Sequence, residues 1–184
     1  MAERDTYSRR DFVQLAMLGT GSLCLLVRCA GQPSAWRFFS DEESRVMDAI
    51  AEQIIPTDEW PGGRDSGVTN FIDRQLTGPY TRFQAAYRQG IAAIQETCQN
   101  RFGRKFEDLA WEEQTTFLEN MENGTINDLP WKEGSSQEFF NLVRDHSMQA
   151  YYGSPRHGGN KKYISYKMLD LDYPHIIGQN RYPV

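Results

Sequence analysis

Residues 40–63 read SDEESRVMDAIAEQIIPTDEWPGG and carry both a helix start and a helix stop. Ser40 and Glu43 have the spacing of a capping box, in which the serine hydroxyl accepts a backbone N–H and the glutamate reaches back to the cap. Apolar side chains then recur every three to four residues, at Val46, Met47, Ile50, Ile54 and Ile55. Pro56 and the Pro- and Gly-containing run behind it end the pattern. The stretch therefore predicts an amphipathic helix over 41–55.

The helical period continues through most of the chain. Further helices are predicted at about 68–76, 83–98, 112–121 and 139–150, the last behind a second capping box at Ser135 and Glu138. Their apolar stripes are Val68, Phe71, Ile72 and Leu76; Phe83, Tyr87, Ile91, Ile94 and Cys98; Phe117, Leu118 and Met121; and Phe139, Leu142, Val143, His146 and Ala150. No segment alternates with a period of two, so we expect almost no sheet. The predicted fold class is all-α: a small irregular domain of about five helices with a long, largely non-regular C-terminal arm.

The N-terminus has the pattern of an export signal. Arg9, Arg10 and Phe12 match the twin-arginine pattern, an address for a route that exports folded proteins. The apolar stretch behind them is weak and shorter than the roughly 20 residues that span a membrane. We therefore expect a cleavable twin-arginine signal over 1–34, a helical domain over 35–152 and a periplasmic location. Lipidation at Cys29 is the less favoured alternative, because Arg28 stands where such sites take a small residue.

Composition and motifs exclude several functions. The 184 residues include 20 Lys and Arg against 25 Asp and Glu, a net charge of -5, which disfavours nucleic-acid binding. The histidines lack metal-ligand spacing, and no dinucleotide-binding glycine motif follows a strand. We therefore predict no catalytic residue, no cofactor site and no metal site in this chain. His146 is expected to be a hydrogen-bonded interior or interface residue and Cys98 an inert buried thiol.

The segment 153–184 differs from the helical part. It is rich in Gly and Pro, and it carries five basic against two acidic side chains. Its tyrosines are Tyr163, Tyr166, Tyr173 and Tyr182. Disordered tails contain few aromatic residues, whereas interface cores favour Tyr and Arg. We therefore expect an arm that binds a partner protein, with an arm that packs back on its own helices as the alternative.

Several motifs together resemble the gluconate 2-dehydrogenase subunit 3 family. They are AEQIIPTD at 51–58, GV at 67–68, FIDRQL at 71–76, GPY at 78–80, YGSPRHGGN at 152–160 and YKML at 166–169, with Pro174 behind them. The resemblance covers most of residues 40–175, and a twin-arginine leader is typical of the family. It implies a small subunit that pairs with a large FAD-containing subunit of the glucose-methanol-choline type. Related complexes oxidise gluconate, glucose, fructose or the 3-hydroxyl of glycosides, some with a cytochrome c as electron acceptor.

The resemblance and the composition of the arm together predict a partner-binding set. Its members are Tyr152, Pro155, Arg156, His157, Gly158, Gly159, Asn160, Tyr163, Tyr166, Lys167, Met168 and Tyr173. The large catalytic subunit is the expected partner, and the twin-arginine translocase is a transient one during export. Two alternatives stay open: an independent periplasmic ligand-binding domain or enzyme that uses His146 or His157, and a structural module anchored through a lipid on Cys29.

Overall fold

The structure, a computed structural model, describes residues 35–127, 129–131 and 136–171. Within these ranges the chain forms α-helices and short 3-10 turns, and no strand. The α-helices are α2 (Asp41–Ile54), α3 (Val68–Leu76), α4 (Gln84–Phe102), α5 (Trp111–Glu122), α6 (Ser136–Tyr152) and α7 (Ile164–Met168). The all-α prediction is confirmed, and the first five of these helices match the predicted ones. Ser135, the cap predicted for α6, lies outside the described residues.

The start of α2 contains the predicted capping box. The Ser40 hydroxyl accepts the Glu43 N–H at 3.2 Å, and the Glu43 carboxylate accepts the Ser40 N–H at 2.8 Å. The end of α2 is held by Glu52, whose carboxylate accepts the N–H of Thr57 at 3.0 Å and that of Arg64 at 3.1 Å. The Glu52 side chain thereby closes the loop that follows Pro56. From the sequence, this loop is recognisable only as the end of a helix.

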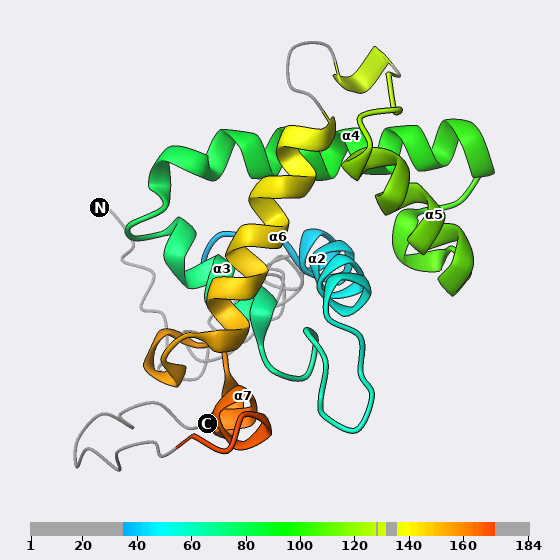
Figure 1. Cartoon of the computed structure of the whole chain (residues 1–184). Coiled ribbons are helices and arrows are strands. Elements are labelled where there is room, and N and C mark those ends of the chain that lie inside the picture. Colours follow the sequence, from blue (N-terminus) through cyan, green and yellow to red (C-terminus); the bar gives the residue numbers. More distant parts are fainter. Residues whose placement is uncertain (1–34, 128, 132–135, 172–184) are drawn as a thin grey trace, which may run out of the picture. The chain divides into compact units, whose positions relative to one another are not determined.

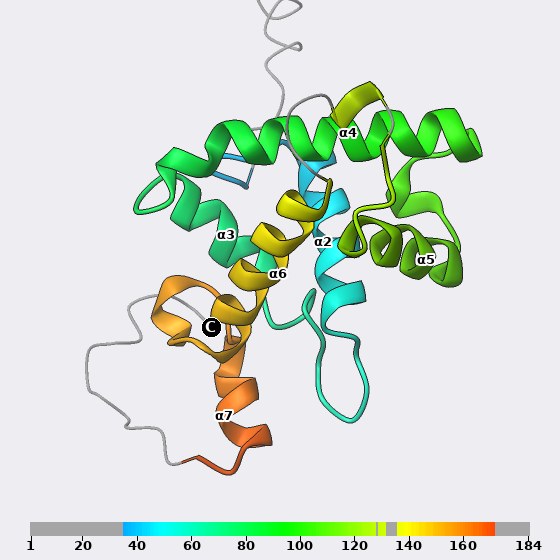
Figure 2. The ribbon, with the colours of Figure 1, turned by 45° about the horizontal axis from the view of Figure 1, so that its top comes forward.

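α4 lies across one end of α6, and α3 and α5 pack along α6 (Figure 1 and Figure 2). α4 approaches α6 closely because Gly90 has no side chain: a Cβ atom there would lie 2.4 Å from the ring of Phe139. The core between the helices consists mainly of the predicted stripes. Their most deeply buried large members include Tyr87, Phe117, Met47, Ile50, Ile72, Leu76, Ile94 and Met121. The chain that follows α6 leaves this helix at the end opposite to α4.

Candidate partner interface

The segment behind α6 has more regular structure than the sequence predicts. The turns η5 (Pro155–His157) and η6 (Lys161–Tyr163) lead into the five-residue helix α7. α7 is too short to produce a recognisable helical period, and Tyr163 before it adopts a left-handed conformation with φ 60°. The described half of the arm is therefore a folded extension of the helical domain, which we call the C-terminal segment (residues 153–171).

Asn160 is buried and links two parts of the C-terminal segment by hydrogen bonds. Its Nδ2 donates to the carbonyl oxygen of Gly153 at 2.8 Å, and its Oδ1 accepts the N–H of Ser165 at 3.0 Å. The residue itself is left-handed, with φ 45°, a conformation that Asn tolerates better than most side chains. One amide group thus joins the end of α6 to the start of α7.

Backbone contacts hold the inner side of this segment against α3 and α6. Asn70 of α3 donates from Nδ2 to the carbonyl oxygen of Gly158 at 2.7 Å, and the Lys161 N–H donates to the Ser66 carbonyl at 3.0 Å. A Cβ atom on Gly159 would lie 2.3 Å from the carbonyl oxygen of Ala150. The inner side of the segment therefore packs on the chain's own helices, and its outer side chains form the candidate surface.

The structure divides the predicted partner-binding residues into buried or partly buried ones and exposed ones. Gly159 and Asn160 are buried, and Pro155, Gly158, Tyr163, Tyr166 and Met168 are partly buried. The exposed members are Tyr152, Arg156, His157 and Lys167. Arg9, Arg10, Phe12, Cys29 and Tyr173 lie outside the described residues. The set is thus a folded patch built on a backbone scaffold, and only part of it faces outward.

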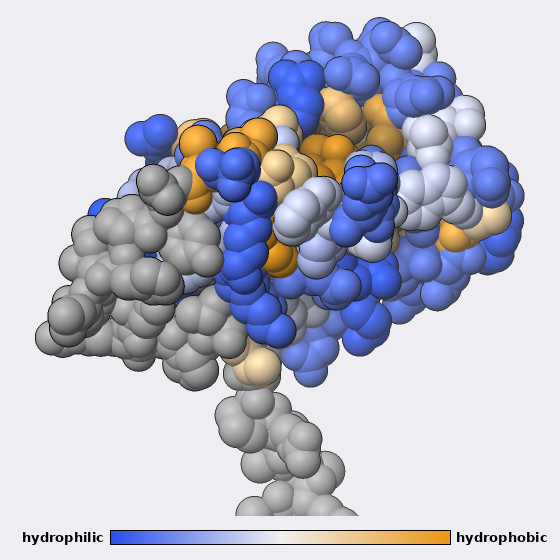
Figure 3. Space-filling model, turned by 60° about the horizontal axis from the view of Figure 1, so that its bottom comes forward, coloured by the Kyte–Doolittle hydropathy of each residue, from blue (hydrophilic) through white to orange (hydrophobic). Residues whose placement is uncertain are grey.

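Exposed apolar side chains that the predicted set omits also lie here. Leu169 and Leu171 are each 50% exposed, and Met148 precedes Tyr152 by one helical turn on α6, so both lie on one face of that helix. Figure 3 shows apolar side chains interrupting a mostly hydrophilic surface on one face of the molecule. The signal for Leu169 was its place in the YKML motif, whereas Met148 was recognisable only as an apolar residue on the hydrophilic side of α6.

Basic groups accompany these apolar side chains. The C-terminal segment carries Arg156, Lys161, Lys162 and Lys167 against one acid, Asp170. The Arg156 Nε donates to His157 Nε2 at 2.9 Å, and burial together with the Arg156 charge lowers the pKa of His157. His157 is therefore a neutral acceptor beside a cation, and the charge of the patch comes from its Arg and Lys side chains.

The sequence model of one family, gluconate 2-dehydrogenase subunit 3, matches residues 41–172. The match runs from the first residue of α2 past the end of α7 and so includes the whole candidate surface. The chain belongs to the gluconate 2-dehydrogenase subunit 3 family. Membership implies a subunit of a multi-subunit dehydrogenase complex, and it confirms the family predicted from the motifs. No curated protein and no solved structure matches the chain.

Two of the groups considered for chemistry, His146 and Cys98, lie in the interior. His146 is 4% exposed, and its Nδ1 lies 2.9 Å from the Tyr87 hydroxyl. Burial lowers the pKa of His146, with a smaller effect of Arg82 in the same direction. Burial also raises the pKa of the Cys98 thiol to about 12, which keeps it protonated and unreactive near neutral pH. Both side chains are buried in the helical core, as their positions on apolar helix faces predict.

Neither a metal-binding cluster nor a membrane-spanning helix occurs among residues 35–127, 129–131 and 136–171. No group of three or more His, Cys, Asp or Glu side chains there is arranged to hold a metal ion. Among the same residues, no helix combines the length and apolarity that crossing a membrane requires.

Proposed function

We propose that this chain is the non-catalytic small subunit of a periplasmic, FAD-dependent sugar or sugar-acid dehydrogenase. The family match over residues 41–172 is the observation that carries the proposal. In this assignment the large subunit, of the glucose-methanol-choline type, holds FAD and oxidises the substrate. The small subunit is needed for export of the folded complex and for stability of the catalytic subunit. A cytochrome c is the proposed electron acceptor in complexes that contain one.

The outer side of the C-terminal segment is the proposed contact with the large subunit. Tyr152, Leu169 and Leu171 supply exposed apolar area, and Arg156 and Lys167 supply charge beside it. Interfaces between folded subunits commonly combine an apolar centre containing Tyr with a polar rim. The composition of this patch therefore supports a protein partner rather than a small ligand.

The twin-arginine pattern supports the proposed role in export. Arg9 and Arg10 precede a weak apolar stretch, and the route that reads such a pair carries folded proteins. A flavoprotein must acquire FAD while it folds, so a partner without its own leader gains an export address by binding this chain. Export of the loaded complex then takes both subunits to the periplasm.

Co-expression with the large subunit tests the proposal. The full chain with its leader and an affinity tag is purified from the periplasm, and the flavin spectrum and sugar-dependent dye reduction are recorded. We expect a larger flavoprotein to co-purify in stoichiometric amount, and both proteins to be absent from the periplasm after Arg9→Lys and Arg10→Lys together. A colourless, stable monomer in the periplasm would contradict the proposal.

A further inference from the structure

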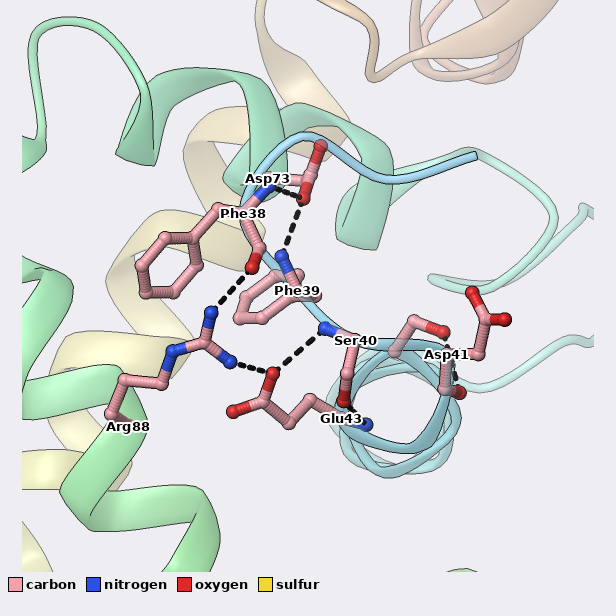
Figure 4. Close-up of polar contacts among 8 residues, drawn as sticks. Phe38, Phe39, Ser40, Asp41, Glu43, Asp73 and Arg88 are labelled. Atoms are coloured by element: carbon pink, nitrogen blue, oxygen red, sulfur yellow. Dashed lines mark hydrogen bonds and ion pairs between the residues drawn. The ribbon is translucent and has the colours of Figure 1, made fainter. Parts of the chain in front are cut away.

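A buried carboxylate holds the chain just before α2 (Figure 4). Asp73 of α3 is 2% exposed, and its Oδ2 accepts the Arg37 N–H at 2.8 Å. Its Oδ1 accepts the N–H groups of Phe38 and Phe39, both at 2.9 Å. Hydrogen bonds to an ionised acceptor are roughly twice as strong as neutral ones, so three of them on one carboxylate fix this backbone firmly.

Arg88 of α4 holds the same stretch from its other side. Its guanidinium donates to the Phe38 carbonyl oxygen at 2.6 Å, lies 4.2 Å from the centre of the Phe38 ring and contacts the Glu43 carboxylate. Glu43 belongs to the capping box of α2 and also accepts the Ser40 N–H. Side chains of three helices, Glu43, Asp73 and Arg88, therefore converge on residues 37–40, and we call them the N-terminal clamp.

The N-terminal clamp makes this stretch a poor protease substrate. An endopeptidase binds the residues directly flanking the cut bond in an extended form and pairs with their backbone groups. Here the N–H groups of residues 37–39 are already engaged, and the Phe39 side chain is buried. Cleavage within residues 37–40 therefore requires local unfolding that breaks the bonds to Asp73.

We infer that the N-terminal clamp sets the limit for removal of the leader: the bond that is cut lies before Trp36, and residues 36–40 stay part of the mature body. The inference rests on the proposed function because it takes the preceding segment to be a removable leader. In the cut, water adds across one amide bond, which leaves a carboxylate on the released leader and a free α-amino group on the body. An endopeptidase of the export machinery supplies the catalysis.

The mass of the exported chain is the first test. We expect the mature protein to begin at residue 36 or earlier. A first residue at 37 or beyond would overturn the inference. An exported chain that keeps its full length would overturn the proposed leader and, with it, the inference that the leader is removed. The protection of residues 37–40 is tested separately by the digestion below.

Trypsin digestion of the purified full chain tests the N-terminal clamp itself. The Arg37 side chain is exposed, so its bond to Phe38 is a trypsin site that the contacts of the N-terminal clamp protect. We expect Asp73→Asn, which removes one carboxylate oxygen at nearly constant volume, to speed cleavage there severalfold, and Asp73→Ala to speed it further. Cleavage after Arg144, which lies in the middle of α6, reports global unfolding in the same digest. Asp108→Ala, an exposed charge removal, serves as the control.

The pattern of the two cuts is decisive. Faster cleavage after Arg37 with an unchanged rate after Arg144 supports the N-terminal clamp. Equal rates after Arg37 in the original chain and in Asp73→Asn would overturn it. If Asp73→Ala accelerates both cuts, Arg88→Met is used in its place, because it removes the outer contacts to Phe38 and leaves the buried carboxylate intact.

Discussion

The hydroxyl of Tyr87 lies 2.9 Å from Nδ1 of His146, and the two rings are within 12° of parallel. The His146 ring also stacks on Tyr80, with the ring centres 4.3 Å apart. Burial raises the pKa of Tyr87 well above its ordinary value and lowers that of His146. The phenol therefore keeps its proton and the imidazole is neutral, so that α4 and α6 share a neutral hydrogen bond within the core.

The lowered pKa of His146 predicts a stability that depends on pH. As the pH falls through about 6.5, the unfolded chain takes up a proton at this residue and the folded chain does not. We expect the free energy of unfolding to decrease between about pH 7.5 and pH 5.5, and the decrease to be smaller in His146→Gln. Denaturant titrations across this range measure it. His157→Gln is measured for comparison, because the pKa of His157 is lowered as well. If the stability of His146→Gln fell with pH as steeply as that of the original chain, the prediction would be refuted.

Replacing the partner of His146 is expected to cost stability without any change in charge. Tyr87→Phe leaves the buried Nδ1 of His146 without its hydrogen-bond partner, and an unsatisfied buried group costs about 1–3 kcal/mol. Urea unfolding at pH 7.5 measures the loss. Tyr80→Phe removes the hydroxyl that contacts Gln149 at the partly exposed edge of the same cluster, so its effect should be clearly smaller. A larger loss in Tyr80→Phe would contradict this account.

A methyl group at Gly90 is expected to disturb the packing where α4 crosses α6. In an open helix, Gly to Ala adds up to about 1 kcal/mol of stability, but here the new Cβ would lie 2.4 Å from the Phe139 ring. We expect Gly90→Ala to destabilise the protein by about 1–3 kcal/mol through overpacking. Gly78→Ala is the matched control because a Cβ there meets only ordinary contacts, at 3.6 Å and beyond. Thermal unfolding of the two variants gives the comparison.

Asn160 should be replaceable by Gly more readily than by Ala. Both substitutions remove the hydrogen bonds to Gly153 and Ser165, but only Ala also adds strain at φ 45°. We expect faster amide hydrogen exchange in residues 153–165 for both variants, more so for Asn160→Ala, with little change in the N–H groups of α4. Uniform acceleration over the whole chain would show that Asn160 supports the entire core rather than the C-terminal segment.

The outer side chains of the C-terminal segment are expected to determine affinity for the large subunit. Central aromatic and apolar anchors can each contribute about 2 kcal/mol or more to binding. Tyr152→Ser with Leu169→Ser should therefore weaken co-purification by at least about tenfold while leaving the melting temperature nearly unchanged, and Tyr163→Ala with Tyr166→Ala should also weaken it. Phe102→Ser, at the exposed end of α4, is the control. Unchanged co-purification in both double variants would place the interface elsewhere.

Helix positions could be predicted from the sequence because each stripe repeats over several turns. The Ser40 capping box and the apolar faces of α2 to α6 are local signals of this kind. α7 was not predictable, since five residues hold little more than one turn and its left-handed entry at Tyr163 depends on contacts made by Asn160.

The N-terminal clamp was missed because Asp73 and Arg88 lie 34 to 50 positions from the residues they hold. A signal existed: Asp73 stands on the same helical face as Thr69 and Leu76, all of them buried. An acid on a buried face requires donors, and only the fold shows that they are the N–H groups of residues 37–39. The candidate interface was predictable as a region, whereas the division between scaffold and surface required the structure.

The C-terminal segment is attached through its main chain and its buried side chains. The Gly158 carbonyl accepts from Asn70, the Lys161 N–H donates to Ser66, and Ile164 is buried in the core. The outward side chains of Arg156, Lys162 and Lys167 take no part in these bonds. Evolution can therefore exchange them freely while the loop keeps its shape, and partner choice can diverge without loss of the fold. The same property makes the segment a natural place to randomise when a chain of this family is to be redirected to a different catalytic subunit.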